Sequence, residues 1–330
     1  MKIGKLPEPV LIRSVLKQLK HRREEVISGP AVGQDCAMME VGPDEVIVLS
    51  SDPITGTVKD IGRHSVHITA NDLAASGAEP IGIMITVMIP ERVREKQLKD
   101  MMADVESACK ELHIEVMGGH TEVTNVVNQP LLSITGVGKV KKTEILKTNQ
   151  VKPGQDIVIT KWIGLEGTTI IAKEKEEKLR ETLPADFVVE ARSFDQYLSV
   201  VEDAQIAKAA DAGVTAMHDI TEGGVFGALW EMGSGADVGM DIDLKKIPIR
   251  QETVEVCEVF DLNPYILMSS GSMLIAADNG EKLVRALKEA GIHAAVVGKA
   301  TEGNDRILRN GEEIRYMDKP QSDELYKIYQ

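Results

Sequence analysis

Hydrophobic and polar positions along the first half of the chain predict strands and helices in turn. The run EVIVLSSD at 45–52 is rich in β-branched residues and ends in polar ones, which predicts a strand that carries Asp52 at its tip. In DIGRHSVHITANDLAASG at 60–77, residues recur at helical spacing and place Asp72 near a largely apolar face. A strand, a helix and a strand follow, which gives the order β, α, β, α, β: IGIMITVMIP, REKQLKDMMADVESACKEL and LLSITGVGKV.

A polar stretch near residues 141–153 interrupts this pattern and predicts a boundary between two domains, residues 1–145 and 146–330. Beyond the boundary the pattern restarts with the strand QDIVITK. The second half then predicts further helices and strands in YLSVVEDAQIAKAADAG, VTAMHD, EGGVFGALWEMG, VGMDIDL and a last strand, helix and strand that end in AAVVGKA. Each half is therefore expected to be an α/β or α+β layer structure.

Composition and charge narrow the class of protein. The chain has 330 residues, 43% of them hydrophobic, which suits two domains of ordinary size. Its net charge of -14 would repel a phosphate backbone, so we expect no nucleic-acid partner. No uncharged run approaches the roughly 18 residues of a membrane helix, and we expect a cytoplasmic protein. The cysteines are far apart and odd in number, which predicts reduced thiols rather than disulfides or a zinc site: Cys36, Cys109 and Cys257.

Acidic residues beside glycines and at the ends of predicted elements are the candidate functional residues. They are Asp35 in VGQDCAM, Asp52 in SSDPITG, Asp72, Glu122 with His120 in GGHTEVT, and Asp219 with Glu222 in MHDITEGG. Carboxylates brought together without matching Lys or Arg repel one another, so a divalent cation normally neutralises such a cluster. Oxygen ligands favour Mg²⁺, which completes its shell with phosphate oxygens, and the N–H groups of Gly118 and Gly119 suit the same phosphates. The residues together predict a site for a nucleotide and its metal.

Each of these residues also has a plainer interpretation. Asp35 and Asp52 both fit turns, where aspartate is a standard residue. His120 by itself is more often structural than catalytic, and Cys36 fits a small packed residue because no base or cation neighbours it in the sequence. Asp72 is harder to explain in structural terms, since a carboxylate on a face of small residues needs a partner.

Six motifs in this order resemble a known superfamily. GQDCAMM, SSD, DIGRHSVHITANDLAASGAEP, GGHTEVT, MHDITEGG and MSSGSMLIA are similar to motifs of the AIR synthase-related proteins. That superfamily includes aminoimidazole ribonucleotide synthetase, thiamine-monophosphate kinase, selenophosphate synthetase and the hydrogenase maturation protein HypE. The resemblance covers nearly the whole chain, and MHDITEGGVFGAL and GGHTEVT look most like HypE-like proteins.

The resemblance implies a two-domain PurM-like fold, with an N-terminal α/β domain that forms a dimeric barrel of strands and a C-terminal α+β domain. It also implies that ATP binds in the cleft between them, with Mg²⁺ held by Asp35, Asp52 and Asp72. The residues that would bind the nucleotide are Gly118 and Gly119, in a turn, with Thr121 and Thr221. Those that would be catalytic are His120, Asp219 and Glu222.

Three functions stay open. The first is an ATP-dependent enzyme that phosphorylates and so activates an oxygen or amide-like group of an unknown small-molecule substrate or partner protein. The second is HypE-type dehydration, although the chain ends in DELYKIYQ without the terminal cysteine of HypE. The third is a nucleotide-binding sensor or scaffold, which Gln34 favours because it replaces the first acid of the family's GDD motif. The protein is expected to be a homodimer through its N-terminal domains, since residues 45–140 would otherwise expose a hydrophobic sheet edge or face.

Overall fold

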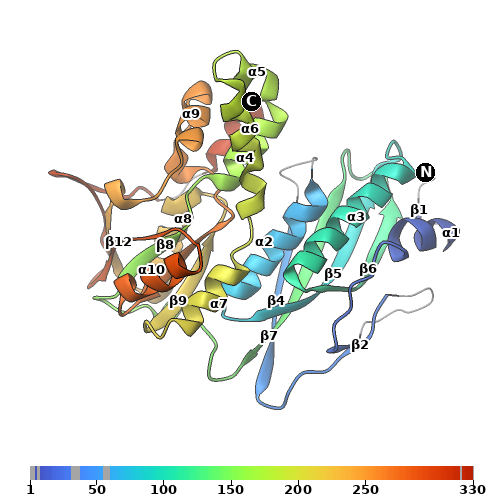
Figure 1. The fold of residues 1–330 in the computed structure, drawn as a ribbon, viewed down its shortest axis with the longest axis horizontal. Coiled ribbons are helices and arrows are strands. Elements are labelled where there is room, and N and C mark those ends of the chain that lie inside the picture. The colour runs from blue at the N-terminus through green and yellow to red at the C-terminus, as the bar shows by residue number, and fades with distance from the viewer. Residues whose placement is uncertain (1–3, 6–7, 31–37, 55–59, 320–321, 330) are drawn as a thin grey trace. The chain divides into compact units, whose positions relative to one another are not determined.

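The computed structural model describes residues 4–5, 8–30, 38–54, 60–319 and 322–329 (Figure 1). Asp35, Cys36 and Gln34 lie outside the described residues. The chain divides into two compact units: unit 1 comprises residues 1–74 and 78–145, and unit 2 comprises residues 75–77 and 146–330. None of the helices in the described ranges is long and apolar enough to cross a membrane.

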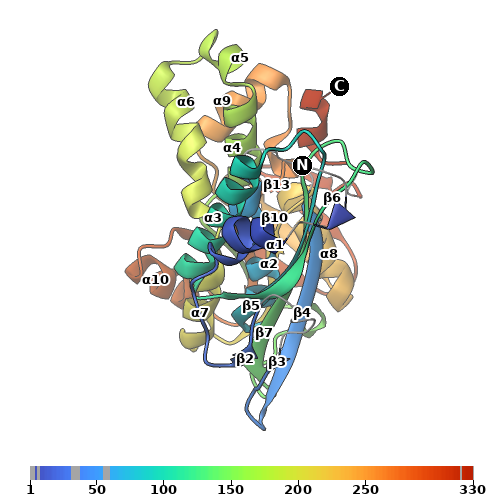
Figure 2. The ribbon, with the colours of Figure 1, turned by 90° about the vertical axis from the view of Figure 1, so that its right-hand side faces the viewer.

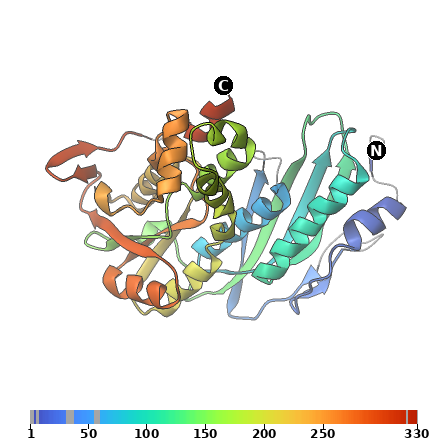
Figure 3. The ribbon, with the colours of Figure 1, turned by 45° about the horizontal axis from the view of Figure 1, so that its top comes forward.

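Unit 1 is built on a five-stranded sheet with two helices on one face. Its strands lie in the order β1–β6–β5–β7–β4 (Figure 1), with the bounds β1 (Gly4–Lys5), β4 (Glu45–Ile54), β5 (Glu79–Ile89), β6 (Glu115–Val123) and β7 (Leu131–Lys141). Figure 2 shows the long edge strand β4 of this sheet. Helix α2 (Ile61–Ala75) connects β4 to β5, and α3 (Glu95–Leu112) connects β5 to β6; Figure 3 shows these helices side by side. A Cβ on Gly62 of α2 would lie 2.7 Å from the Met101 carbonyl oxygen, so glycine lets the two helices pack closely.

Shorter elements lie between β1 and β4 in the chain. A helical segment consists of α1 (Glu8–Leu11) followed by the π-helical η1 (Ile12–Leu16). Strands β2 (Val26–Ser28) and β3 (Met38–Met39) then pair antiparallel as a small separate sheet.

The strands and helices predicted for the first half are confirmed, except around the Gly118–Gly119 pair. We expected a turn there, and this is wrong: both glycines lie inside β6, a strand that the sequence did not predict. The pairing with β5 slips by one residue just before Gly118, which is a β-bulge. A Cβ on Gly119 would lie 1.9 Å from the Ile85 carbonyl oxygen, and its φ is 148°. Glycine is needed there for a close approach of two strands.

Side chains of β4 alternate between the two faces of the sheet. Ser50 and Asp52 point to the helix-covered face, because Gly136, which pairs with Ser50, lies against side chains of α2. Ile47 and Leu49 point to the opposite face, where they are 46% and 64% exposed. The edge strand β4 therefore carries Ser50 and Asp52 on the helix-covered face and exposed apolar side chains on the other.

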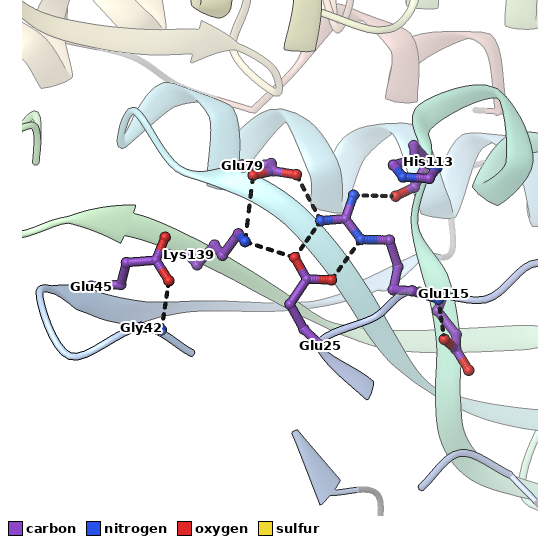
Figure 4. A network of polar contacts seen from close by, with 8 residues as sticks. Glu25, Gly42, Glu45, Glu79, His113, Glu115 and Lys139 are labelled. Atoms are coloured by element: carbon purple, nitrogen blue, oxygen red, sulfur yellow. Dashed lines mark hydrogen bonds and ion pairs between the residues drawn. The ribbon is translucent and has the colours of Figure 1, made fainter. Parts of the chain in front are cut away.

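A buried ion-pair network fastens the segment before β2 to this sheet (Figure 4). Arg23 Nη2 lies 2.6 Å from Glu25 Oε1 and 2.7 Å from Glu79 Oε1, and Lys139 Nζ lies 2.7 Å from Glu25 Oε1. The Arg23 and Glu25 side chains are only 6% and 7% exposed. Hydrogen bonds from Arg23, helped by Lys139 and opposed by burial, lower the pKa of Glu25 to about 2. Residues 23–25 are thereby tied to the start of β5 and to β7.

Unit 2 is built on a seven-stranded sheet in the order β14–β13–β10–β12–β8–β11–β9. The bounds are β8 (Asp156–Thr160), β9 (Val214–Ile220), β10 (Gly239–Asp243), β11 (Ser272–Ala277), β12 (Ala294–Thr301), β13 (Arg306–Asn310) and β14 (Glu313–Tyr316). Helix α8 (Gly224–Ala236) packs on the face of β8 that carries Ile157 and Ile159. Helix α10 (Gly280–Glu289) covers the other face, since Gly280 lies against Asp156. The predicted strands are confirmed; β13 and β14 were not predicted.

A cluster of helices forms a second apolar core in unit 2. It contains α4 (Leu165–Glu174), α5 (Glu176–Arg180), α6 (Ala185–Arg192), α9 (Gln251–Phe260) and the 3₁₀ segment η6 (Glu324–Tyr329). Helix α7 (Val201–Ala209) lies next to α10. Leu325 of η6 is fully buried in this core, so the last described segment is part of the fold.

Candidate functional site

Two acids of unit 1 meet at one serine hydroxyl. Asp52 lies near the end of β4 and Asp72 lies on α2, in the small-residue stretch NDLAASG. Ser50 Oγ lies 3.3 Å from Asp52 Oδ2 and within hydrogen-bonding distance of Asp72 Oδ2. The helix-covered face of β4 presents Ser50 and Asp52 together because they are two residues apart on a strand. The structure therefore brings together two of the three predicted metal ligands.

The chemistry of this pair fits a magnesium ion. A serine hydroxyl has a single hydrogen and no charge, so it donates to one of these carboxylates at a time and neutralises the charge of neither. The remaining like charge favours a hard divalent cation, and the donors here are all oxygen atoms. Asp35, the third predicted ligand, lies outside the described residues. Within the described residues, no group of three or more His, Cys, Asp or Glu side chains forms a metal site.

His120 is not brought to these acids within one chain. Cross-strand pairing runs from Asp52 through Ile134 and Ile85 to Gly119, and paired residues share a face. The next residue along β6, His120, therefore points to the opposite face of the sheet. There it is about half exposed, at 49% of its side chain.

The neighbours of His120 divide between the same two faces. Glu122 accompanies it, with an Oε2 that lies 3.2 Å from His120 Nε2. Thr121 lies on the helix-covered face and is buried. Gly119 and Thr121 thus occupy positions of β6 on the same face of the sheet as Asp52. Gly118 occupies a position on the opposite face.

Three glycine- and serine-rich loops of unit 2 are joined by hydrogen bonds. They are the start of α4, the connection from β9 to α8 and the segment before β11: Gly164–Gly167, Thr221–Gly224 and Met268–Gly271. Gly164 N donates to Ser269 Oγ at 2.7 Å, and Ser269 N donates to the Thr221 carbonyl oxygen at 3.3 Å. The N-termini of α4 and α8 therefore lie near one another, and helix N-termini favour anions.

The last segment of the chain fastens two of these loops. Asp323 is buried, and its Oδ2 accepts a hydrogen bond from Gly223 N at 2.7 Å. Its Oδ1 accepts from Met268 N at 3.2 Å and from Leu325 N at 2.8 Å. Burial raises the pKa of Asp323, against the effect of these three donors.

The predicted catalytic acids of unit 2 lie at the same loops. Asp219 ends β9 and is buried, and its Oδ2 has no hydrogen-bond partner among the described residues. His218 Nε2 bonds Glu231 at 2.9 Å. Although burial opposes its charge, the carboxylates of Asp219 and Glu231 raise the pKa of His218 to about 9. Glu222 lies beside Tyr326 of the last segment.

Glu166 is a functional candidate that the sequence reasoning missed. Its Oε2 accepts a hydrogen bond from Ser270 N at 3.3 Å. Burial raises its pKa to about 7, the bonds from Ser270 oppose the rise, and the charges of Asp323 and Asp219 add to it. Glu166 can therefore hold a proton near neutral pH. Its signal was present, since it lies between two glycines in GLEG, the context that singled out the other acids.

Comparison with known proteins identifies the family on both halves of the chain. The model of the AIR synthase related protein N-terminal domain matches residues 33–140, and that of the C-terminal domain matches residues 152–309. The chain belongs to the AIR synthase-related family. The resemblance drawn from the motifs is confirmed.

Relatives within this family cover nearly the whole chain. A hydrogenase expression/formation protein of Methanocaldococcus jannaschii is 27% identical over 314 residues, which span 92% of this chain and 90% of that protein. The carbamoyl dehydratase HypE of Azotobacter vinelandii is 27% identical over 285 residues, 83% of this chain and 81% of HypE.

Solved structures of the family share the fold. HypE in complex with ATP matches with a TM-score of 0.78 at 19% identity, over 98% of this chain and 97% of HypE. HypE in a complex with HypF matches with a TM-score of 0.71 at 22% identity, over 83% of this chain and 90% of HypE. The predicted two-domain PurM-like fold is confirmed.

Proposed function

We propose that this protein is a Mg²⁺-dependent enzyme that uses ATP to phosphorylate, and so to activate, an oxygen or amide-like group of an acceptor. The observation that carries the proposal is the convergence of Asp52 and Asp72 on the single hydroxyl of Ser50. The structure of HypE, a protein of the same fold, was solved in complex with ATP, which supports a nucleotide as the ligand here. Domain 1–145 would bind ATP and the metal, and domain 146–330 would bind the acceptor.

The proposed roles of the residues follow from their chemistry. Asp35, Asp52 and Asp72 would hold Mg²⁺, which when bound neutralises negative charge on phosphate oxygens. Gly118, Gly119 and Thr121 are proposed to approach the phosphates, together with the hydroxyl of Thr221. Two observations in unit 2 suit phosphoryl transfer: N–H groups gather at the starts of α4 and α8, and the Asp219 Oδ2 atom is buried without a described partner.

The acids of unit 2 are proposed to donate and accept protons during the reaction. Glu166, with its pKa raised to about 7, is able to donate or accept a proton near neutrality. Asp219 and Glu222 are proposed to contact the acceptor. His120 lies on the opposite face of the unit 1 sheet from Asp52. A catalytic role for His120 therefore requires that the face without helices contacts the nucleotide site of a second chain.

HypE-type dehydration is the second candidate, favoured by the relatives named carbamoyl dehydratase. That reaction needs a thiol acceptor, and the described cysteines do not supply one. Cys109 and Cys257 are buried, and burial raises the pKa of the Cys257 thiol to about 12. Cys36 lies outside the described residues, so the acceptor thiol would be that of Cys36 or of another chain. A nucleotide-binding sensor is the third candidate, which Gln34 favours.

Transfer of a radiolabelled γ-phosphate tests the enzyme proposal. We expect the label of ATP to move to a component of a cell extract, or to water, only when Mg²⁺ is present. Asp219→Asn should reduce this transfer while Mg-ATP binding persists, and Asp186→Asn, an exposed acid on α6, should leave both unchanged. Mg-ATP binding without any transfer would favour the sensor, and no Mg-ATP binding would contradict the proposal.

We also propose a homodimer through the N-terminal domains. The edge strand β4 is ten residues long and exposes Ile47 and Leu49 on the face that carries no helix. We expect light scattering at micromolar concentration to give the mass of two chains, and Leu49→Glu to give the mass of one. A monomeric mass for the unchanged protein would contradict the dimer. A different partner protein, as in the HypE–HypF complex, would then be the candidate to cover this face.

A further inference from the structure

Aromatic side chains are confined to one unit of this protein. Its two Trp, five Tyr and four Phe residues all fall between residues 162 and 329, in unit 2. Four of them line a single pocket: Phe226, Tyr265, Tyr316 and Tyr326. The Phe226 and Tyr265 rings are stacked, with centroids 5.2 Å apart and planes 7° apart. Four of the eleven aromatic residues thus meet at one cavity.

The volume and the apolar lining of this pocket suit a small molecule. Its volume is about 660 Å³, within the range of roughly 300–1,000 Å³ that is usual for small-molecule sites. Leu244, Ile266 and Leu308 add apolar surface to the aromatic wall. The wall is thus able to bury a flat apolar ring system on several sides.

Three cations lie among the lining residues of the pocket, beside three acids. Arg315, Lys319 and Lys327 line it. Lys327 is paired with Glu324, whereas Arg315 and Lys319 form no ion pair within the described residues. Arg315 and Tyr265 both line the pocket; burial raises the pKa of Tyr265, and the positive charge of Arg315 acts against this rise.

The acids of the pocket are largely committed to other contacts. Asp323 accepts three backbone hydrogen bonds, and Glu324 bonds Asn263 N at 3.0 Å as well as Lys327. Asp318 is the remaining acid in the described lining. Arg315 and Lys319 are thus the two cations of the described lining that are free to contact an anionic group of a ligand.

We propose that this pocket binds a second ligand besides the nucleotide, a planar aromatic molecule that carries a negatively charged group. The ring packs against the Phe226–Tyr265 stack and Tyr316, and the anionic group meets Arg315. The described lining residues all belong to unit 2, and they include neither Asp52 nor Asp72.

Calorimetric titration with a simple aromatic phosphate tests this proposal. The probe is naphthyl phosphate, compared with naphthol, which lacks the charge, and with inorganic phosphate, which lacks the ring. We expect naphthyl phosphate to bind at one site per chain, and each comparison compound to bind about tenfold more weakly. Saturating Mg²⁺ with a non-hydrolysable ATP analogue should leave this binding unchanged.

Matched variants locate the binding. Arg315→Gln should weaken naphthyl phosphate about fivefold and leave naphthol unchanged, because it removes a charge-assisted contact. Tyr316→Ser, at a side chain that is 66% exposed, should weaken both compounds about equally. Arg309→Gln is the control: Arg309 lies on the neighbouring strand β13, where it pairs with Asp241 at 2.6 Å, outside the described pocket lining.

Several results would overturn the proposal. One is the absence of saturable binding at millimolar probe. Another is binding that neither Arg315→Gln nor Tyr316→Ser changes, and a third is displacement of the probe by the ATP analogue, which would make the pocket part of the nucleotide site. Folding of each variant is verified by the fluorescence of Trp162 and Trp230, which both lie in unit 2.

Discussion

Asp72→Asn is expected to weaken Mg-ATP binding by about tenfold or more without loss of thermal stability. Asparagine keeps the size and shape of the side chain and still offers an oxygen to the Ser50 hydroxyl. It removes one of the two negative charges that converge there, and with it a strong ligand for Mg²⁺. The melting temperature without nucleotide should stay level or rise, because repulsion with Asp52 is relieved. Isothermal titration with Mg-ATP and thermal melts measure the two effects.

A structural role for Asp72 makes the opposite prediction. If its carboxylate only satisfies hydrogen-bond donors, Asn should cost roughly 1–3 kcal/mol of stability and leave Mg-ATP affinity nearly unchanged. Asp100→Asn, on the exposed side of α3, is the matched control and should change neither quantity. Unchanged Mg-ATP binding in the Asp72 variant would contradict the proposal that Asp72 binds Mg²⁺. It would also contradict most of the site proposed for unit 1.

Arg23→Met is expected to cost unit 1 about 3 kcal/mol of stability. The substitution leaves the Glu25 carboxylate buried, and of the two cations that contact it in Figure 4 only Lys139 remains. Arg63→Met is the control, since it removes a more exposed pair with Glu111 and should cost less than about 1 kcal/mol. Unit 1 contains no Phe, Tyr or Trp, so hydrogen exchange of its strands is the measurement.

The ion-pair network around Glu25 also predicts that the stability of unit 1 depends on pH. The folded pKa of Glu25, about 2, lies below its ordinary value of 4.5, so the unfolded chain binds more protons between these values. The stability that Glu25 contributes is therefore complete above pH 4.5 and is lost as the pH falls through 2. The difference in stability between the protein and Glu25→Gln should shrink over this window. A difference that stays constant from pH 6 to about pH 2.5 would contradict the role of the network.

The periodic patterns of the sequence were sufficient for most strands and helices. The alternation in 45–52 and the helical spacing in 60–77 reflect local burial of one face, and such patterns survive in the folded protein as β4 and α2. The glycine pair Gly118–Gly119 was misread because glycine signals an unusual backbone without saying which one. Only the pairing of β6 with β5, whose register shifts just before Gly118, makes this segment a bulged strand rather than a turn.

The candidate site shows the same division between local and long-range information. The sequence by itself determined that Asp52 lies near the end of a strand and that Asp72 lies on a small-residue helix, since both follow from spacing along the chain. Only the tertiary structure decided that both approach Ser50, and that His120 faces the other side of the sheet. Residues far apart in the chain likewise join at Glu166 and Asp323, and at the aromatic pocket, because strand order and loop packing bring them together. No local period encodes these pairings, since they depend on which strands become neighbours.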